Sequence, residues 1–258
     1  MSWLGRRIVA GLVGIAPAVV ASALVTLPSD TAVAQTAVNY GFVSPNTKEN
    51  LKLEDAIKGM RSPEETKLVN QSINMGCVVR SPVRAFRSLG SWSDGAEHSV
   101  MIRVESDEST VRYLLSRLGR DARQKSILYF HPQRTGTADL YTLRPRRPIR
   151  NLTALAQTLE RAGIAFRTLV PVKSGTWIYI VDLKRDLRDE VMTAAKKLRA
   201  SVRTETGNAA FVGDDQPDEA KVVFDEEIRQ YETKNPNLPP TCDVQGHKKA
   251  PKTQRKPQ

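Results

Sequence analysis

Residues 139–183, DLYTLRPRRPIRNLTALAQTLERAGIAFRTLVPVKSGTWIYIVDL, decide the fold. Residues 139–143 predict a strand. Asn151 then offers a helix cap, and the leucines and alanines after it recur with the period of an amphipathic helix. Residues 165–170 predict a second strand, and a Lys-Ser-Gly turn leads into a returning strand over residues 176–183. The stretch therefore predicts a strand, a helix and a β-hairpin in succession.

The same pattern continues on both sides of this stretch. From Ser99 onward we expect a strand, a capped helix and two further strands, and after residue 183 a helix and a last strand that ends at Val212. This order predicts an α+β fold, a ferredoxin-like (split β-α-β) antiparallel sheet with helices on one face. The pattern leaves open whether one extended sheet or two half-domains form.

Outside the sheet we expect short helices before it, and a C-terminal helix with a disordered tail after it. Ser62-Pro63-Glu64-Glu65 predicts a capped helix start, whereas residues 35–50 predict an irregular leader and residues 80–97, with one proline and two glycines, a loop. We expect a signal peptide over residues 1–34, an N-terminal helical and loop region over residues 35–98 and an α+β domain over residues 99–212. A C-terminal helix over residues 213–234 and a disordered basic tail over residues 235–258 complete the chain.

The N-terminus has the three parts of a secretory signal peptide. Arg6 and Arg7 precede a charge-free apolar run over residues 8–27, and Ala32-Val33-Ala34 offers a small-x-small cleavage site before Gln35. We expect export from a bacterial cytoplasm, a periplasmic or secreted location, and a mature chain that begins at Gln35 without a transmembrane segment. The apolar run is also long enough to be retained as an anchor, so this alternative stays open.

The net charge indicates which classes of partner to expect, and the cysteine content indicates a disulfide. The formal net charge of +11 favours anionic surfaces, such as a cell-envelope polymer, although a protein partner stays open. We do not expect nucleic acid, because the aromatic RNA-binding consensus is missing. The two cysteines of an exported chain predict a disulfide between Cys77 and Cys242.

Sequence motifs favour a binding protein over an enzyme. No nucleotide-binding, metalloprotease or nucleophile-elbow pattern occurs, and the three histidines lack a metal-ligand spacing, so we expect no catalytic residue, metal or cofactor. Glu105, Asp107 and Glu108 lie between a predicted strand and a predicted helix. Acidic residues are common at the start of a helix, so these three do not indicate a catalytic pair. The alternative is an unrecognised exported enzyme, such as a hydrolase, acting near the loop over residues 92–98.

The most specific charge feature is the segment RPRRPIR over residues 144–150. Its two prolines hold the backbone extended, and guanidinium groups pair well with carboxylates and phosphates. The segment also leads into a helix N-terminus, which favours anions. A solvated basic connection would have the same composition. The residues that we expect to contact an anion are Arg144, Arg146, Arg147 and Arg150.

The stretch from Asp139 to Leu198 also resembles the sporulation-related repeat, a small exported domain that binds peptidoglycan. The residues that carry the resemblance are Asn151, Leu155, Leu159, Gly163 and Tyr179-Ile180-Val181. The resemblance implies the β-α-β-β-α-β order and an envelope ligand. Together these observations predict an exported, non-catalytic protein that binds an anionic wall or membrane polymer. A subunit of a larger envelope or secretion complex, with the C-terminal helix and tail as docking elements, is the other alternative.

Overall fold

The computed structural model describes residues 37–44, 51–60, 62–92, 95–164, 166–214 and 216–239. Its strands are β1 (Val38–Val43), β2 (Val83–Trp92), β3 (Gly95–Glu105), β4 (Ser126–Pro132), β5 (Ala138–Pro145), β6 (Arg167–Val172), β7 (Gly175–Asp182) and β8 (Ala200–Gly213). Its helices are α1 (Leu53–Gly59), α2 (Pro63–Val78), α3 (Glu108–Asp121), α4 (Leu152–Glu160), α5 (Arg188–Leu198) and α6 (Pro217–Lys234).

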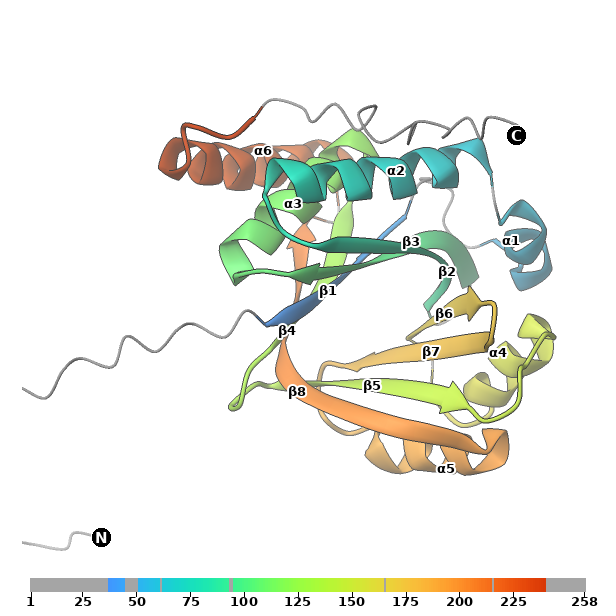
Figure 1. The fold of residues 1–258 in the computed structure, drawn as a ribbon. Coiled ribbons are helices and arrows are strands. Elements are labelled where there is room, and N and C mark those ends of the chain that lie inside the picture. The colour runs from blue at the N-terminus through green and yellow to red at the C-terminus, as the bar shows by residue number, and fades with distance from the viewer. Residues whose placement is uncertain are drawn as a thin grey trace, which may run out of the picture. The chain divides into compact units, whose positions relative to one another are not determined.

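The strands form one closed antiparallel barrel in the order β1-β3-β2-β6-β7-β5-β8-β4 (Figure 1). The first four strands follow one another as β4-β1-β3-β2, and the last four as β8-β5-β7-β6, which is the same internal order. Each half would leave two open edges, and the β2–β6 and β4–β8 pairings join these edges. Closure therefore gives every strand of the barrel a partner on both sides.

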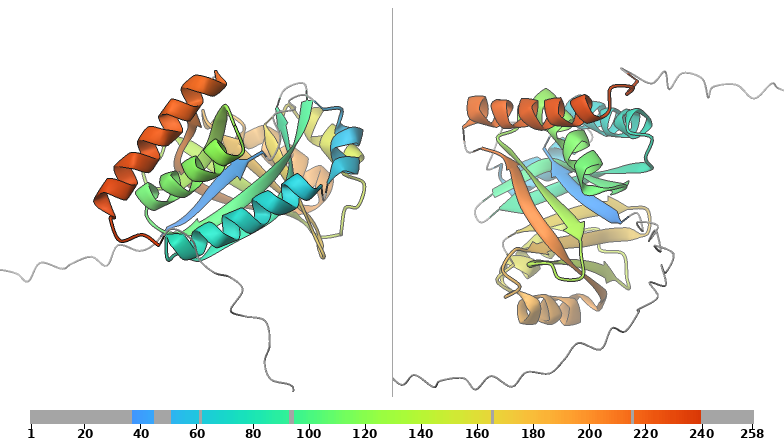
Figure 2. Two further views of the ribbon diagram at one scale, coloured as in Figure 1. Left: turned by 90° about the horizontal axis from the view of Figure 1, so that it is seen from above. Right: turned by 90° about the vertical axis from the view of Figure 1, so that its left-hand side faces the viewer.

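The prediction of an open ferredoxin-like sheet is wrong. The physical reason lies in β8, which is long enough to pair with β5 through residues 200–207 and with β4 through residues 207–213. The right-hand view of Figure 2 shows β8 running from the α5 side of the barrel to the α6 side. Gly207 lies at the changeover, where an added Cβ would come within 2.2 Å of the backbone oxygen of His131.

Two segments that we expected to be irregular also belong to the barrel. Residues 38–43 of the expected leader form β1, which lies between β3 and β4. Residues 83–92 of the expected loop form β2, which pairs along its whole length with β3. The strands therefore begin well before Ser99, the residue at which we expected the sheet to start.

The core has three parts, one inside the barrel and two outside it. The interior part contains aromatic and aliphatic side chains from six strands: Tyr40, Phe42, Met101, Leu128, Phe130, Ala138, Leu140, Val170, Tyr179 and Val181. Phe86 of β2 packs against them. The outer faces of the strands are covered by α2, α3 and α6 on one side and by α1, α4 and α5 on the other (Figure 1).

Local sequence signals place several of these helices. The side chain of Ser62 accepts a hydrogen bond from the Glu65 amide at the start of α2, which confirms the predicted cap. Asp107 and Asn151 cap α3 and α4 in the same way, accepting from the amides of Thr110 and Ala154. An Asn, Asp or Ser cap stabilises a helix by about 1 kcal/mol relative to alanine.

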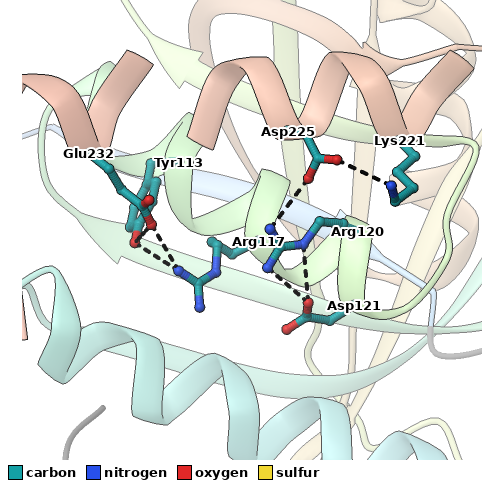
Figure 3. A network of polar contacts seen from close by, with 7 residues as sticks. All are labelled: Tyr113, Arg117, Arg120, Asp121, Lys221, Asp225 and Glu232. Atoms are coloured by element: carbon teal, nitrogen blue, oxygen red, sulfur yellow. Dashed lines mark hydrogen bonds and ion pairs between the residues drawn. The ribbon is translucent and has the colours of Figure 1, made fainter. Parts of the chain in front are cut away.

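Polar contacts bind α6 to α3, as Figure 3 shows. Asp225 pairs with Arg120 at 3.3 Å and with Lys221 at 3.4 Å. Glu232 accepts hydrogen bonds from the Tyr113 hydroxyl at 3.1 Å and from Arg117 at 3.0 Å. Because the buried face of α6 is narrow, limited to Ala220, Phe224 and Ile228, these contacts fix how the helix lies on α3.

No helix within the described ranges has the length and apolar character that a membrane span requires. The expected signal peptide lies outside the described residues, as do residues 240–258 of the expected tail, Cys242 among them. The first five residues of that tail are described, and Leu238 packs against the core part that α2, α3 and α6 cover. Cys77, the expected partner of Cys242, lies near the end of α2, and the bond between them stays a prediction.

Candidate anion-binding site

The predicted arginine segment ends up beside the C-terminus of α5. Arg144 and Pro145 are the last residues of β5, where they pair with Ser201 and Ala200 of β8. The amide of Arg146 then donates a hydrogen bond to the backbone oxygen of Arg199 at 3.1 Å. This bond holds the basic segment against a helix end that comes about fifty residues later in the sequence.

Four cationic side chains meet here around a surface pocket of about 430 Å³. Its lining consists of Arg146, Arg147, Ala195, Lys196, Arg199 and Ala200, and we call it the basic pocket. Within the described ranges, no carboxylate forms an ion pair with any of its four cations. The volume falls within the range of about 300–1,000 Å³ that is usual for small-molecule sites.

The basic pocket combines cations of different origin. Lys196 lies in the last turn of α5, where a cation also offsets the negative end of the helix dipole. The helix dipole does not account for Arg146 and Arg147, which come from the β5–α4 connection. Since like charges repel, four unpaired cations around one hollow favour an anionic ligand that would bridge them.

Arg199 occupies the basic pocket with an unusual backbone. It caps α5 with φ of 49° and ψ of 44°, in the left-handed region that glycine adopts most readily. A residue with a Cβ carries a cost of about 1–2 kcal/mol in that conformation. The chain thus keeps a guanidinium group at a position where glycine would stabilise the helix end better.

The four predicted arginines do not act as one set. Arg146 and Arg147 line the basic pocket, whereas Arg150 is exposed just before α4 and does not line it. Arg144 instead contacts Trp177 of β7, and its guanidinium carbon lies 4.4 Å from the centre of the Trp177 ring. The sequence analysis does not identify Lys196 and Arg199. Their place at the basic end of a predicted helix is the signal that could have indicated them.

Two of the three histidines and two of the acidic residues at the start of α3 have structural partners. The Nε2 atom of His98 lies 2.6 Å from the backbone oxygen of Ala56, and Nδ1 of His131 contacts the side-chain oxygen of Asn39. Asp107 is a helix cap, and Glu108 accepts a hydrogen bond from the Tyr129 hydroxyl. Among the described residues, no group of three or more His, Cys, Asp or Glu side chains could hold a metal ion.

Comparisons with known proteins do not identify the chain. No family model matches it, and no curated protein matches it. It aligns with two solved structures that are both named "putative monooxygenase". The one from Lactobacillus acidophilus NCFM shares 9% identity over 68% of this chain and 95% of its own, with a TM-score of 0.24. The one from Fusobacterium nucleatum subsp. nucleatum ATCC 25586 shares 11% identity over 67% and 91%, with a TM-score of 0.23. At these scores neither alignment carries an argument about this chain.

Proposed function

We propose that this protein is an exported, non-catalytic binding protein that attaches to an anionic polymer of the cell envelope through the basic pocket. The observation that carries the proposal is the meeting of Arg146, Arg147, Lys196 and Arg199 around one hollow without a carboxylate partner among the described residues. The resemblance of residues 139–198 to a peptidoglycan-binding repeat adds support for an envelope ligand, and so does the signal-like N-terminus.

A polymer suits the basic pocket better than a single small anion does. The pocket is open, and the four side chains come from two separate segments, so repeated anionic groups can engage them one after another. Arg150 and the lysines of the C-terminal tail add cationic charge to the same chain. Several weak charge contacts along one polymer strengthen binding through a high effective concentration.

Co-sedimentation of the full chain with purified bacterial cell wall tests the proposal. A pocket variant carries Arg146→Ser, Arg147→Ser, Lys196→Ser and Arg199→Ser. A charge-matched control changes four exposed cations elsewhere to serine: Arg123, Arg134, Arg161 and Lys173. Both are compared in a background in which the tail cations Lys248, Lys249, Lys252, Arg255 and Lys256 are also serine, because the tail could bind the same surfaces.

We expect the control to sediment with cell wall as the parent does, and the pocket variant to stay in the supernatant. Equal sedimentation of both variants would show that net charge, rather than the basic pocket, governs binding. Anionic lipid vesicles form a second arm, and pocket-dependent binding to vesicles but not to wall would replace the wall polymer with a membrane. N-terminal sequencing of the protein from its host tests export separately, with Gln35 as the expected first residue.

A further inference from the structure

One mouth of the barrel gathers charged and aromatic side chains on its inner face. Tyr40 of β1 pairs with Arg103 of β3, and Thr142 of β5 pairs with both Tyr179 of β7 and Arg203 of β8. Alternate residues of a strand point to the same side, and Tyr40 and Tyr179 belong to the interior part of the core. Their ring centres lie 6.0 Å apart. The side chains therefore converge within the barrel, and we call this place the barrel mouth.

Several polar groups of the barrel mouth already have partners. Arg103 pairs with Glu105 at 3.4 Å, and Arg203 pairs with Glu205 at 3.0 Å. The Tyr40 hydroxyl lies 3.5 Å from the same Glu205 carboxylate. Two of the guanidinium groups at the mouth are thus neutralised by carboxylates, and one of the two phenols has an acceptor.

Three donors at the barrel mouth have no such partner. The Tyr179 side chain is only 5% exposed, yet its hydroxyl makes no hydrogen bond with any residue that the structure describes. The Nε atom of Arg103 is buried and also lacks an acceptor. The Arg144 guanidinium lies over the Trp177 ring and forms no ion pair within the described ranges. Of the three, Arg103 Nε is the fully buried one, and a buried donor without a partner costs about 1–3 kcal/mol, so an acceptor at this place would stabilise the protein.

The electrostatic surroundings keep Tyr179 a donor. Burial, followed by the neighbouring Tyr40, raises the pKa of Tyr179 to about 12, against the opposing effects of Arg144 and Arg103. Its hydroxyl is therefore protonated at neutral pH. Because Arg103 and Arg144 both lower the pKa of Tyr179, both guanidinium groups lie near its hydroxyl, in agreement with the strand register.

We propose that the barrel mouth binds one carboxylate group of a small aromatic acid, with the Tyr179 hydroxyl, Arg103 Nε and the Arg144 guanidinium as donors. An anionic ligand fits because Arg144 forms no ion pair among the described residues, and neither does Arg84 of β2, which pairs with Arg103 in the strand register. An aromatic body fits because the rings of Tyr40, Tyr179 and Trp177 surround the donors. This site is separate from the basic pocket, so it stands or falls independently of the proposed function.

Calorimetric titration of the full chain tests this site with benzoate, acetate and inorganic phosphate as probes. We expect saturable binding of benzoate that is tighter than that of acetate or phosphate. Tyr179→Phe keeps the ring and removes one donor, so benzoate affinity should fall about 3–10-fold. Arg144→Gln removes the charged donor, and the affinity should fall about tenfold or more.

The control is Arg146→Gln with Arg199→Gln, which changes the basic pocket and should leave benzoate affinity unchanged. Circular dichroism establishes that each variant is folded, and the near-isosteric Tyr179→Phe keeps the test decisive if Arg144→Gln does not fold. Failure of benzoate to saturate the wild type would overturn the proposal and would mean that water satisfies these donors. Equal benzoate affinity in the wild type and Tyr179→Phe would overturn it as well, as would equal affinities for benzoate and phosphate.

Discussion

The guanidinium group of Arg144 stacks over the indole ring of Trp177, with its central carbon 4.4 Å from the ring centre. This contact turns Arg144 away from the basic segment in which the sequence places it and toward the barrel mouth. The two candidate sites consequently lie next to each other at the end of β5, one on Arg144 of the strand and one on Arg146 and Arg147 directly after it.

The stacking of Arg144 on Trp177 should contribute to stability. We expect Arg144→Gln to lower the free energy of unfolding by about 0.5–1 kcal/mol, as is usual for a cation on an aromatic face near the surface. Urea unfolding followed by circular dichroism measures this, and the tryptophan emission should shift as the ring loses its cover. Arg147→Gln is the matched control, since Arg147 is exposed and contacts no aromatic ring among the residues that the structure describes. Equal losses in both variants would argue against a stabilising stack.

Arg199 should favour binding at the expense of stability. We expect Arg199→Gly to raise the free energy of unfolding by up to about 1 kcal/mol, because glycine adopts the left-handed conformation without strain. The same change should weaken cell-wall binding. Arg123 follows α3 with φ of 53° and lies outside the basic pocket, so Arg123→Gly should be stabilising without loss of binding. An Arg199→Gly variant that binds as well as the wild type would remove Arg199 from the site.

Barrel closure should depend on Gly207. A Cβ at this position would lie 2.2 Å from the His131 backbone oxygen and 2.7 Å from the Phe130 ring, and the backbone atom cannot move without breaking the β4–β8 pairing. We expect Gly207→Ala to lower the free energy of unfolding by about 3 kcal/mol. Gly90→Ala meets only the Glu97 side chain, at 3.1 Å, and should cost less than about 1 kcal/mol. Equal urea midpoints for the two variants would contradict the closed barrel.

Buried tyrosines should make the fold sensitive to alkali. Burial is the main cause that raises the pKa values of Tyr129, Tyr141 and Tyr179 to about 12, with nearby acids contributing at Tyr129 and Tyr141. The ordinary pKa is 10.0, so the unfolded chain releases these protons first. Their stabilising contribution is therefore complete below pH 10 and is lost as the pH rises toward 12. As the pH rises, tyrosinate absorbance should show that Tyr129, Tyr141 and Tyr179 ionise together with unfolding. Ionisation of all six tyrosines of the chain near pH 10, while the protein stays folded, would refute this prediction.

The sequence predicted individual elements better than their assembly. The caps at Ser62 and Asn151 and the turn before Gly175 depend on neighbouring residues, and each is present in the structure. Barrel closure depends on pairing β2 with β6, about eighty residues apart, and no local signal specifies such a pairing. Residues 83–92 escaped detection as a strand because Arg84, Ser88 and Gly90 share the inward face with Phe86, so that face shows no apolar alternation.

The candidate sites were predictable to a similar extent. Arg146 and Arg147 could be identified because four arginines and two prolines occur within seven residues. Lys196 and Arg199 join them only through the hydrogen bond from Arg146 to the end of α5. The unpartnered donors of Arg103 and Tyr179 could not be inferred, because whether such groups find an acceptor depends on strands from both halves of the barrel.

The salt dependence of polyanion binding tests the central claim most directly. Calorimetric affinities of the full chain for inorganic polyphosphate of defined length are measured over a series of salt concentrations, for the wild type and for the pocket variant with four serines. If the basic pocket is the binding site, the wild type should bind more tightly and lose affinity more steeply with salt, by about 0.7–0.9 in logarithmic slope for each cation removed. Identical slopes and affinities in the wild type and the pocket variant would contradict the account.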